Sequence, residues 1–377
     1  MKRVLHFLKE ETVLVISFLL AVVSMFFVAP SAAYLEYIDY RTISLLFCLM
    51  CVVAGLNGLG IFRRLAGLLL KRVKSVRALC LTGVLLCYFS SMIITNDVAL
   101  ITFVPLTLIT LKMSGGEKFI IPVVTLETIA ANLGSMLTPI GNPQNVFLFS
   151  AFEMSLGQFL ITILPYAALS LVLLVGGCFL LPKASVFLQP KSHEPESVAE
   201  KIGKKRFGIR TAIYAALLVV ALLAVFRVFP YWIALIATAV LVLASDFRTL
   251  ARVDYSLLFT FVFLFIFIGN LGNIEAIGSF LHDTVGGNEV VAGVLCSQIF
   301  SNVPAAVLLS NFTKDAFSLL VGVNLGGLGT LIASMASLIS FRFVVREKVS
   351  AGKYLLVFTV LNVVMLLLNL ALWLIIR

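Results

Sequence analysis

The stretch ETIAANLGSMLTPIGNPQN, residues 127–145, places glycines, two prolines and a row of amides and hydroxyls inside an otherwise apolar segment. A second stretch, VGVNLGGLGTLIASMAS at residues 321–337, resembles it in the other half of the chain. Proline removes a helical hydrogen bond, and glycine tolerates backbone conformations that end a helix. The two stretches therefore predict helices that break partway along their length, once in each half.

The composition predicts that these breaks lie within a lipid bilayer. The chain has 377 residues, of which 61% are hydrophobic and 12% charged, and its mean hydropathy is +1.11. Apolar runs of roughly 20 residues recur along it, which is the length that an α-helix needs to cross a bilayer. We therefore predict an all-α polytopic membrane protein.

The net charge of +10 predicts topology and not nucleic-acid binding, because Lys and Arg concentrate in short loops, as they do in cytoplasmic loops. We expect no nucleic-acid partner. Lys2, Arg3 and Lys9 place the N-terminus in the cytoplasm, and the C-terminal Arg377 is expected outside. The pattern predicts about nine spans in the inner membrane of the cell, the first over residues 12–30, with each broken helix as one span.

Three other segments have a predicted place. Residues 61–77 combine Arg and Lys with apolar positions and indicate a helix along the inner interface. Residues 182–210 form the long hydrophilic loop, expected as a cytoplasmic linker. The loop near residues 275–289 holds acidic residues without Lys or Arg and is expected outside.

Two apolar segments carry a polar tripeptide at their middle: TND at residues 95–97 and SNV at residues 301–303. Basic residues flank both ends of the first segment, so we expect it to enter and leave the membrane on the cytoplasmic side as a re-entrant hairpin. The second is expected to do the same from outside. Irregular backbone at membrane depth requires protein or a wet cavity around it.

The order of these features repeats. DYRTISLLF at residues 39–47 resembles DYSLLF at 254–259, and the hairpin tips and broken helices follow in the same order. We predict a first repeat over residues 1–181 and an inverted second repeat over 211–377. Inverted repeats with interrupted helices indicate a secondary transporter with a binding site at the membrane midplane.

At these residues the chain resembles the ion transporter superfamily, which includes the sodium-coupled dicarboxylate and citrate symporters and the arsenite and sodium–proton antiporter permeases. TND and SNV stand where the symporters carry Ser-Asn-Thr. The segments TNDVALITFVPL and TPIGNPQN are more similar to the arsenite-permease branch. The resemblance covers almost the whole chain. It implies a scaffold and a moving transport domain with an elevator motion, usually in a homodimer.

The resemblance also implies two cation clamps, built from hairpin-tip residues and broken-helix carbonyls, with the anion between the tips. Together with the repeat matches, it predicts substrate contacts at Thr95, Asn96, Asn142, Ser301, Asn302 and Thr330. Cation binding or coupling is expected at Asp97, Glu127, Thr138, Gly141, Asn145, Asn324 and Gly329. We expect Na⁺ itself at Asn96, Asp97, Gly141 and Asn302.

Two carboxylates keep two interpretations each. Asp97 either holds Na⁺ or a proton at membrane depth, or caps the half-helix that follows it. Glu127 is either a proton carrier or a buried neutral side chain bonded to its neighbours. No predicted span carries Arg or Lys at its centre, so anion binding is expected to rest on amides and helix ends.

We therefore expect a secondary active transporter for a small anion, with Na⁺ or H⁺ as coupling ion and with no cofactor or enzymatic activity. A Na⁺/H⁺ antiporter and an arsenite-type efflux permease are the alternatives.

Overall fold

A computed structural model describes residues 11–70, 73–185, 204–347 and 349–377. These residues form helices, joined by turns, and no strand within the described ranges beyond an isolated bridge between Ser75 and Ser185. The prediction of an all-α, multi-pass membrane protein is confirmed. The expected linker at 182–210 lies mostly outside the described residues, as do Lys2, Arg3 and Lys9.

The first half of the described chain is made of helices. They are α2 (Thr12–Ser24), α3 (Tyr34–Tyr37), α4 (Tyr40–Gly58), α5 (Ile61–Leu70), α6 (Val76–Ile94), α7 (Asn96–Met113), η1 (Glu117–Phe119), α8 (Ile120–Ser135), α9 (Pro143–Ala151) and α10 (Leu156–Phe179).

The second half continues in the same manner. Its helices are α12 (Lys204–Val225), α13 (Tyr231–Asp246), η2 (Phe247–Arg252), α14 (Tyr255–Gly272), α15 (Glu275–Val285), α16 (Glu289–Phe300), α17 (Asn302–Ser310), α18 (Ala316–Gly326), α19 (Met335–Arg346) and α20 (Ala351–Ile376).

In the described part of the chain, eight helices are long and apolar enough to cross a membrane. This set differs from the nine predicted spans, because α6 and α7 of the first hairpin belong to it, whereas the two broken helices and α2 do not. The predicted first span ran on to residue 30, but α2 has 13 residues and ends at Ser24, whose hydroxyl donates to the Ala21 carbonyl at 2.7 Å. The expected outer loop is also partly helical, as α15.

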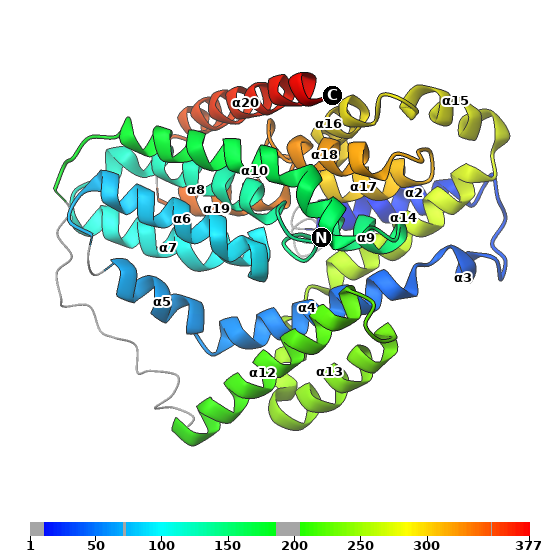
Figure 1. Cartoon of the computed structure of the whole chain (residues 1–377), viewed down its shortest axis with the longest axis horizontal. Coiled ribbons are helices and arrows are strands. Elements are labelled where there is room, and N and C mark those ends of the chain that lie inside the picture. The colour runs from blue at the N-terminus through cyan, green and yellow to red at the C-terminus, as the bar shows by residue number, and fades with distance from the viewer. Residues whose placement is uncertain (1–10, 71–72, 186–203, 348) are drawn as a thin grey trace, which may run out of the picture.

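Two groups of three helices face each other in the fold. Figure 1 shows α6, α7 and α8 on one side of the molecule and α16, α17 and α18 on the other. Glycine allows close packing inside each group: a Cβ on Gly134 of α8 would meet the Tyr88 backbone of α6, and one on Gly293 of α16 would meet the backbone of Gly322 in α18. Small residues of this kind let membrane helices approach closely.

The two halves begin α4 and α14 in the same way. Asp39 has φ −77° and ψ 87°, and its side chain accepts the Thr42 N–H at the start of α4. Asp254 has φ −79° and ψ 84°, and its side chain accepts the Leu257 N–H at the start of α14. The sequence match DYRTISLLF and DYSLLF thus corresponds to the same local structure, an acidic N-cap. The direction of the two repeats across the membrane stays a prediction.

Candidate functional site

Each predicted hairpin tip is a break of one residue between two helices. Thr95 lies between α6 and α7 with φ 69° and ψ 152°, and Ser301 lies between α16 and α17 with φ 76° and ψ 154°. This conformation belongs to a region that residues other than glycine rarely occupy. The chain therefore changes direction at both tips without a wide loop. Re-entry from one membrane face stays a prediction.

The two predicted broken helices are unwound, the first where glycine and proline occur and the second where glycines occur. The first stops at Ser135 and resumes at Pro143, whose ring suits the first turn of α9, with Asn142 as N-cap. The second stops at Gly326 and resumes at Met335. Backbone groups left free by such breaks need side-chain or ligand partners.

Three asparagines join the two broken helices across the centre. Asn142 Nδ2 donates to Asn324 Oδ1 at 3.1 Å, and Asn324 Nδ2 donates to Asn145 Oδ1 at 2.7 Å. Asn145 Nδ2 in turn donates to the carbonyls of Met136 and Thr138 at 3.2 and 3.0 Å. All three asparagines are buried. The free carbonyls of the first break are thus bonded to a network that extends into the second half.

A second network connects the first tip to the second broken helix. Asn96 Nδ2 donates to Asn132 Oδ1 at 3.0 Å, and the Ser334 hydroxyl donates to the same oxygen at 3.0 Å. At the other tip, the Asn302 N–H donates to the Ala333 carbonyl at 3.0 Å. The structure therefore gathers both tips and both broken helices around one buried polar centre.

A cavity of about 540 Å³ opens beside this centre. The N-terminal ends of α7, α9, α14 and α19 all reach it, through Asp97, Pro143, Asp254 and Met335. The remaining polar lining consists of Asn57, Arg63, Thr95, Asn142 and Arg252. Helix N-termini carry partial positive charge and favour anions; Asp97 and Asp254 offset this charge at α7 and α14, and the ends of α9 and α19 keep it.

The two carboxylates of interest lie in different surroundings. Asp97 lines the cavity, and its buried Oδ1 has no hydrogen-bond partner among the described residues. Glu127 does not line this cavity. It is fully buried between α6, α7 and α8, where the Thr107 hydroxyl donates to its Oε1 at 2.6 Å. Its Oε2 has no partner in the described ranges, and its carboxyl group fills the space where a Cβ on Gly83 would stand.

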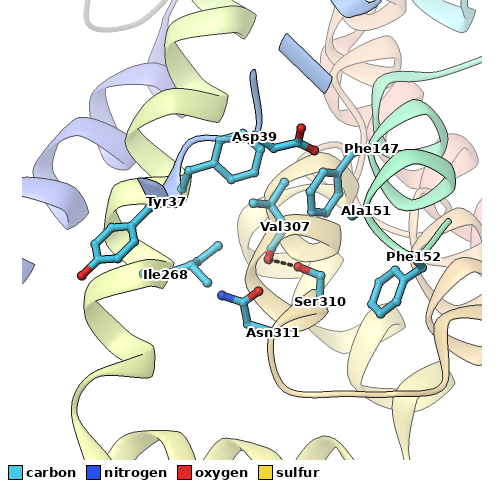
Figure 2. Close-up of a pocket in the computed structure, with 11 residues that line it drawn as sticks. Tyr37, Asp39, Phe147, Ala151, Phe152, Ile268, Val307, Ser310 and Asn311 are labelled. Carbon is cyan, nitrogen blue, oxygen red and sulfur yellow. Dashed lines mark hydrogen bonds between the residues drawn. The ribbon is translucent and has the colours of Figure 1, made fainter. Parts of the chain in front are cut away.

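A second cavity of about 360 Å³ lies among the α3–α4 junction, α9, α14 and α17 (Figure 2). Asp39, Tyr37, Ser310 and Asn311 are its polar lining residues, and the Ser310 hydroxyl donates to the Val307 carbonyl at 2.8 Å. Among the described residues that line it, none is a Lys or Arg and none belongs to a hairpin tip. Its lining therefore differs in charge from that of the larger cavity.

Two predicted site residues of the second break contact Gln298 instead of the larger cavity. Thr330 is exposed, and its N–H donates to the Gln298 side chain at 2.9 Å. Gly329 has φ +108°, and a Cβ there would also meet Gln298. Both residues shape the second break.

Two predicted residues of the first break also contact neighbouring backbone groups and do not line the larger cavity. The Thr138 hydroxyl donates to the Met92 carbonyl of α6, and a Cβ on Gly141 would meet the Ser135 carbonyl. Of the predicted site residues, the three that line the cavity are Thr95, Asp97 and Asn142.

Sequence reasoning missed three contributors. Gln298 Nε2 donates to the carbonyls of Gly326 and Leu328 at 2.9 Å each, so α16 supplies partners for the second break. Its sequence signal is a polar residue three positions before the tip. Arg63 and Arg252 are topology markers when the sequence is read alone, yet both line the cavity.

The sequence also matches a known protein family. The sequence profile of the citrate transporter family, CitMHS, matches residues 7–316. The chain belongs to this family. The predicted membership of the ion transporter superfamily is thereby confirmed, and this citrate transporter family member is an integral membrane transporter.

Three relatives of this citrate transporter family member extend the comparison. An uncharacterized transporter of Methanocaldococcus jannaschii is 35% identical over 325 residues, which cover 85% of each chain. The inner membrane protein YbiR of Escherichia coli is 32% identical over 328 residues, covering 81% of this chain and 80% of YbiR. A silicon efflux transporter of Oryza sativa subsp. japonica is 36% identical over 131 residues, or 34% of this chain and 26% of the relative.

Proposed function

We propose that this membrane transporter is a secondary active carrier that moves a small anion across the inner membrane, coupled to Na⁺ or H⁺. The observation that carries the proposal is the meeting of two hairpin tips and two broken helices at one polar centre, beside a cavity that four helix N-termini reach. Unwound helices of this kind bind anionic groups at their N-terminal ends and cations at free carbonyls.

The proposed solute contacts are Thr95 and Asn142 in the cavity, with Asn96, Asn302 and Ser301 buried in the polar centre beside it. Amide and hydroxyl groups orient the oxygens of a solute without fixing a high charge. We therefore favour a small carboxylate or oxyanion of low charge over a trianion. One relative is named as a silicon efflux transporter, which is consistent with transport of a small solute.

The proposed cation site is at the first tip. Asp97 Oδ1 is a buried oxygen that lacks a partner within the described residues, and oxygen atoms are the ligands that Na⁺ requires. Asn96 Oδ1 accepts the Asp97 N–H at 3.0 Å, so the tip is also capped from within. The Gly141 carbonyl and Asn302 remain candidate Na⁺ ligands from the family pattern.

We propose an elevator motion in which the α6–α8 and α16–α18 groups move past α4, α12 and α13, in a homodimer with a cytoplasmic N-terminus. The packing supports this division, because the Tyr214 ring of α12 lies against Gly55 of α4 and its hydroxyl contacts Thr249 of η2 at 2.8 Å. These elements hold one another through contacts that do not involve the breaks.

One observation favours a second function, Na⁺/H⁺ antiport. Asp97 and Glu127 are both carboxylates with one buried oxygen that has no partner in the described part of the chain. Buried membrane carboxylates often carry protons in transporters. An antiporter would use both and need no organic solute.

Uptake into proteoliposomes tests these functions against each other. We expect accumulation of a labelled small carboxylate or oxyanion that rises with an imposed Na⁺ or H⁺ gradient. Uptake that ignores both gradients would contradict the proposal. Na⁺/H⁺ exchange that proceeds equally without any organic or inorganic anion substrate would establish the second function instead.

A further inference from the structure

We propose that Arg63 and Arg252 form an anion-binding site in the wall of the 540 Å³ cavity, where the solute binds before it reaches the helix breaks. The inference rests on the proposed function and deepens it, because it assigns the carboxylate or oxyanion a first binding site apart from the helix breaks. The two arginines come from α5 and η2, so the site is built on elements that carry neither a tip nor a broken helix.

Arg63 reaches the cavity because of how α5 begins. The chain turns at Gly60, with φ 71°, and Arg63 follows in the first turn of α5. The next residue, Arg64, points elsewhere: its guanidinium carbon lies 4.7 Å from the centre of the Phe207 ring of α12. Two adjacent arginines thus have different roles, and only the first lines the cavity.

Arg252 is placed by close packing on α4. Its guanidinium occupies the space that a Cβ on Gly58 would fill, at the C-terminal end of α4. Across the described residues, neither Arg252 nor Arg63 forms a salt bridge or a side-chain hydrogen bond. Arg248, one turn earlier in η2, instead lies over the Phe247 ring at 6.0 Å. Both cavity arginines therefore present guanidinium groups whose donors are available to a ligand.

The cavity also holds two carboxylates, which must be weighed against the arginines. Asp254 accepts the Leu257 N–H at 2.9 Å, so the positive end of α14 offsets its charge. Asp97 is in the first turn of α7, where the positive helix end also favours its charge. The charges of Arg63 and Arg252 balance those of Asp97 and Asp254, and the N-termini of α9 and α19 add partial positive charge. The net charge around the cavity is therefore positive, so the cavity attracts an anion.

The chemistry of guanidinium specifies the ligand class. Its planar group of N–H donors matches two oxygens of one carboxylate or phosphate, which a lysine cannot reproduce. A positively lined cleft with low-dielectric walls also raises the local concentration of anions. Such a site would select anions at the entrance and leave hydrogen-bonded recognition to the amides at the breaks.

The test measures the local potential without requiring transport. The full chain is prepared with its six cysteines replaced and Ile101→Cys added, since Ile101 lines the cavity and is 46% exposed. The rates of modification by an anionic sulfonatoethyl and a cationic trimethylammonioethyl methanethiosulfonate are compared with those of a free thiol. We expect a preference for the anionic reagent, reduced ~3- to 10-fold by Arg63→Gln or Arg252→Gln.

Matched controls come from the neighbouring arginines. Arg64→Gln and Arg248→Gln remove the same charge from the same helices, and we expect the reagent preference to change less than about twofold because both side chains lie over rings away from the cavity. Arg63→Lys and Arg252→Lys should keep the preference. A preference for the cationic reagent in the parent protein, or equal effects of the control variants, would overturn the proposal.

Binding is measured on the same reporter. Inorganic phosphate or succinate should slow modification more than chloride at equal ionic strength, and Arg63→Gln or Arg252→Gln should remove this protection. Protection that persists in both variants would overturn the site. If the reagent preference and protection depend on the arginines but no uptake occurs in proteoliposomes, the proposed function fails and the site stands. If uptake has an unchanged KM in both Gln variants, the site fails and the proposed function stands.

Discussion

Thr95 and Ser301 have the same backbone conformation, within 7° in φ and 2° in ψ, although they belong to different halves of the chain (φ/ψ 69°/152° and 76°/154°). Both are residues with a Cβ held where glycine is normally required, at a cost on the order of 1–3 kcal/mol each. The fold thus stores strain at the two points where its paired helices meet.

Glycine at either tip should relieve this strain. We predict that Thr95→Gly is more stable than Thr95→Ala by ~1–2 kcal/mol, and that Ser301 behaves in the same way. Thermal unfolding in detergent measures the difference. Thr110, within regular α7, is the control, because there Ala should be more stable than Gly by about 1 kcal/mol. An Ala variant at Thr95 as stable as the Gly variant would show that the tip is not strained.

Asn324 is expected to stabilise both halves together. Replacement by Ala removes its bonds to Asn142 and Asn145 and takes the donor from the buried Asn145 Oδ1, so we predict a loss of about 2–4 kcal/mol. A double-mutant cycle with Asn142→Ala should show coupling of at least ~0.5 kcal/mol. Asn362→Ala is a suitable control, because this buried asparagine donates to the Phe358 carbonyl of its own helix. Additive effects of the two mutations would argue against the network.

Asp97 should decide the response to cations. If its Oδ1, which has no partner among the described residues, is a ligand, Na⁺ raises the thermal midpoint of the parent protein and has no effect on Asp97→Asn. Asp315→Asn serves as the control, since Asp315 caps α18 by accepting the Ser318 N–H and does not line the cavity. A Na⁺-induced shift of equal size in Asp97→Asn would assign Asp97 to helix capping.

Two substitutions of Glu127 distinguish its effect on protein stability from its effect on proton coupling. Glu127→Gln keeps the oxygen that accepts the Thr107 hydroxyl, so we predict a change in stability below ~1 kcal/mol. Glu127→Ala should cost about 3 kcal/mol or more, because it leaves an empty space and an unpaired hydroxyl. Transport assays of Glu127→Gln then report on proton coupling alone. Gradient-driven uptake equal to that of the parent protein would leave Glu127 with a packing role.

The helix breaks could be predicted from the sequence because their causes are local. Gly141, Asn142 and Pro143 act within a few residues of one another, and the structure unwinds the chain at that position. The end of α2 could not be predicted in this way. The sequence stays apolar beyond Ser24, and the helix nevertheless ends there.

The charged part of the cavity depends on tertiary packing and was therefore missed. Arg63 and Arg252 lie far apart in the sequence, and their positive charges also fit an explanation by membrane topology. Gln298 was missed because its partners are backbone carbonyls at the end of α18 and in the break that follows, which no side-chain pattern reveals. The sequence shows that these residues are polar, but it does not show which residues they contact in the fold.

The chain of amides from Asn142 through Asn324 to Asn145 has a consequence for how tightly any solute can be held. A solute that uses these groups must displace bonds that the protein already makes with itself, so much of the enthalpy of each new bond is offset by the breaking of an internal one. Exchange of partners on this pattern favours modest affinity and fast release. In a carrier that releases its solute in every transport cycle, internal hydrogen bonds between amides compete with the solute and promote its release.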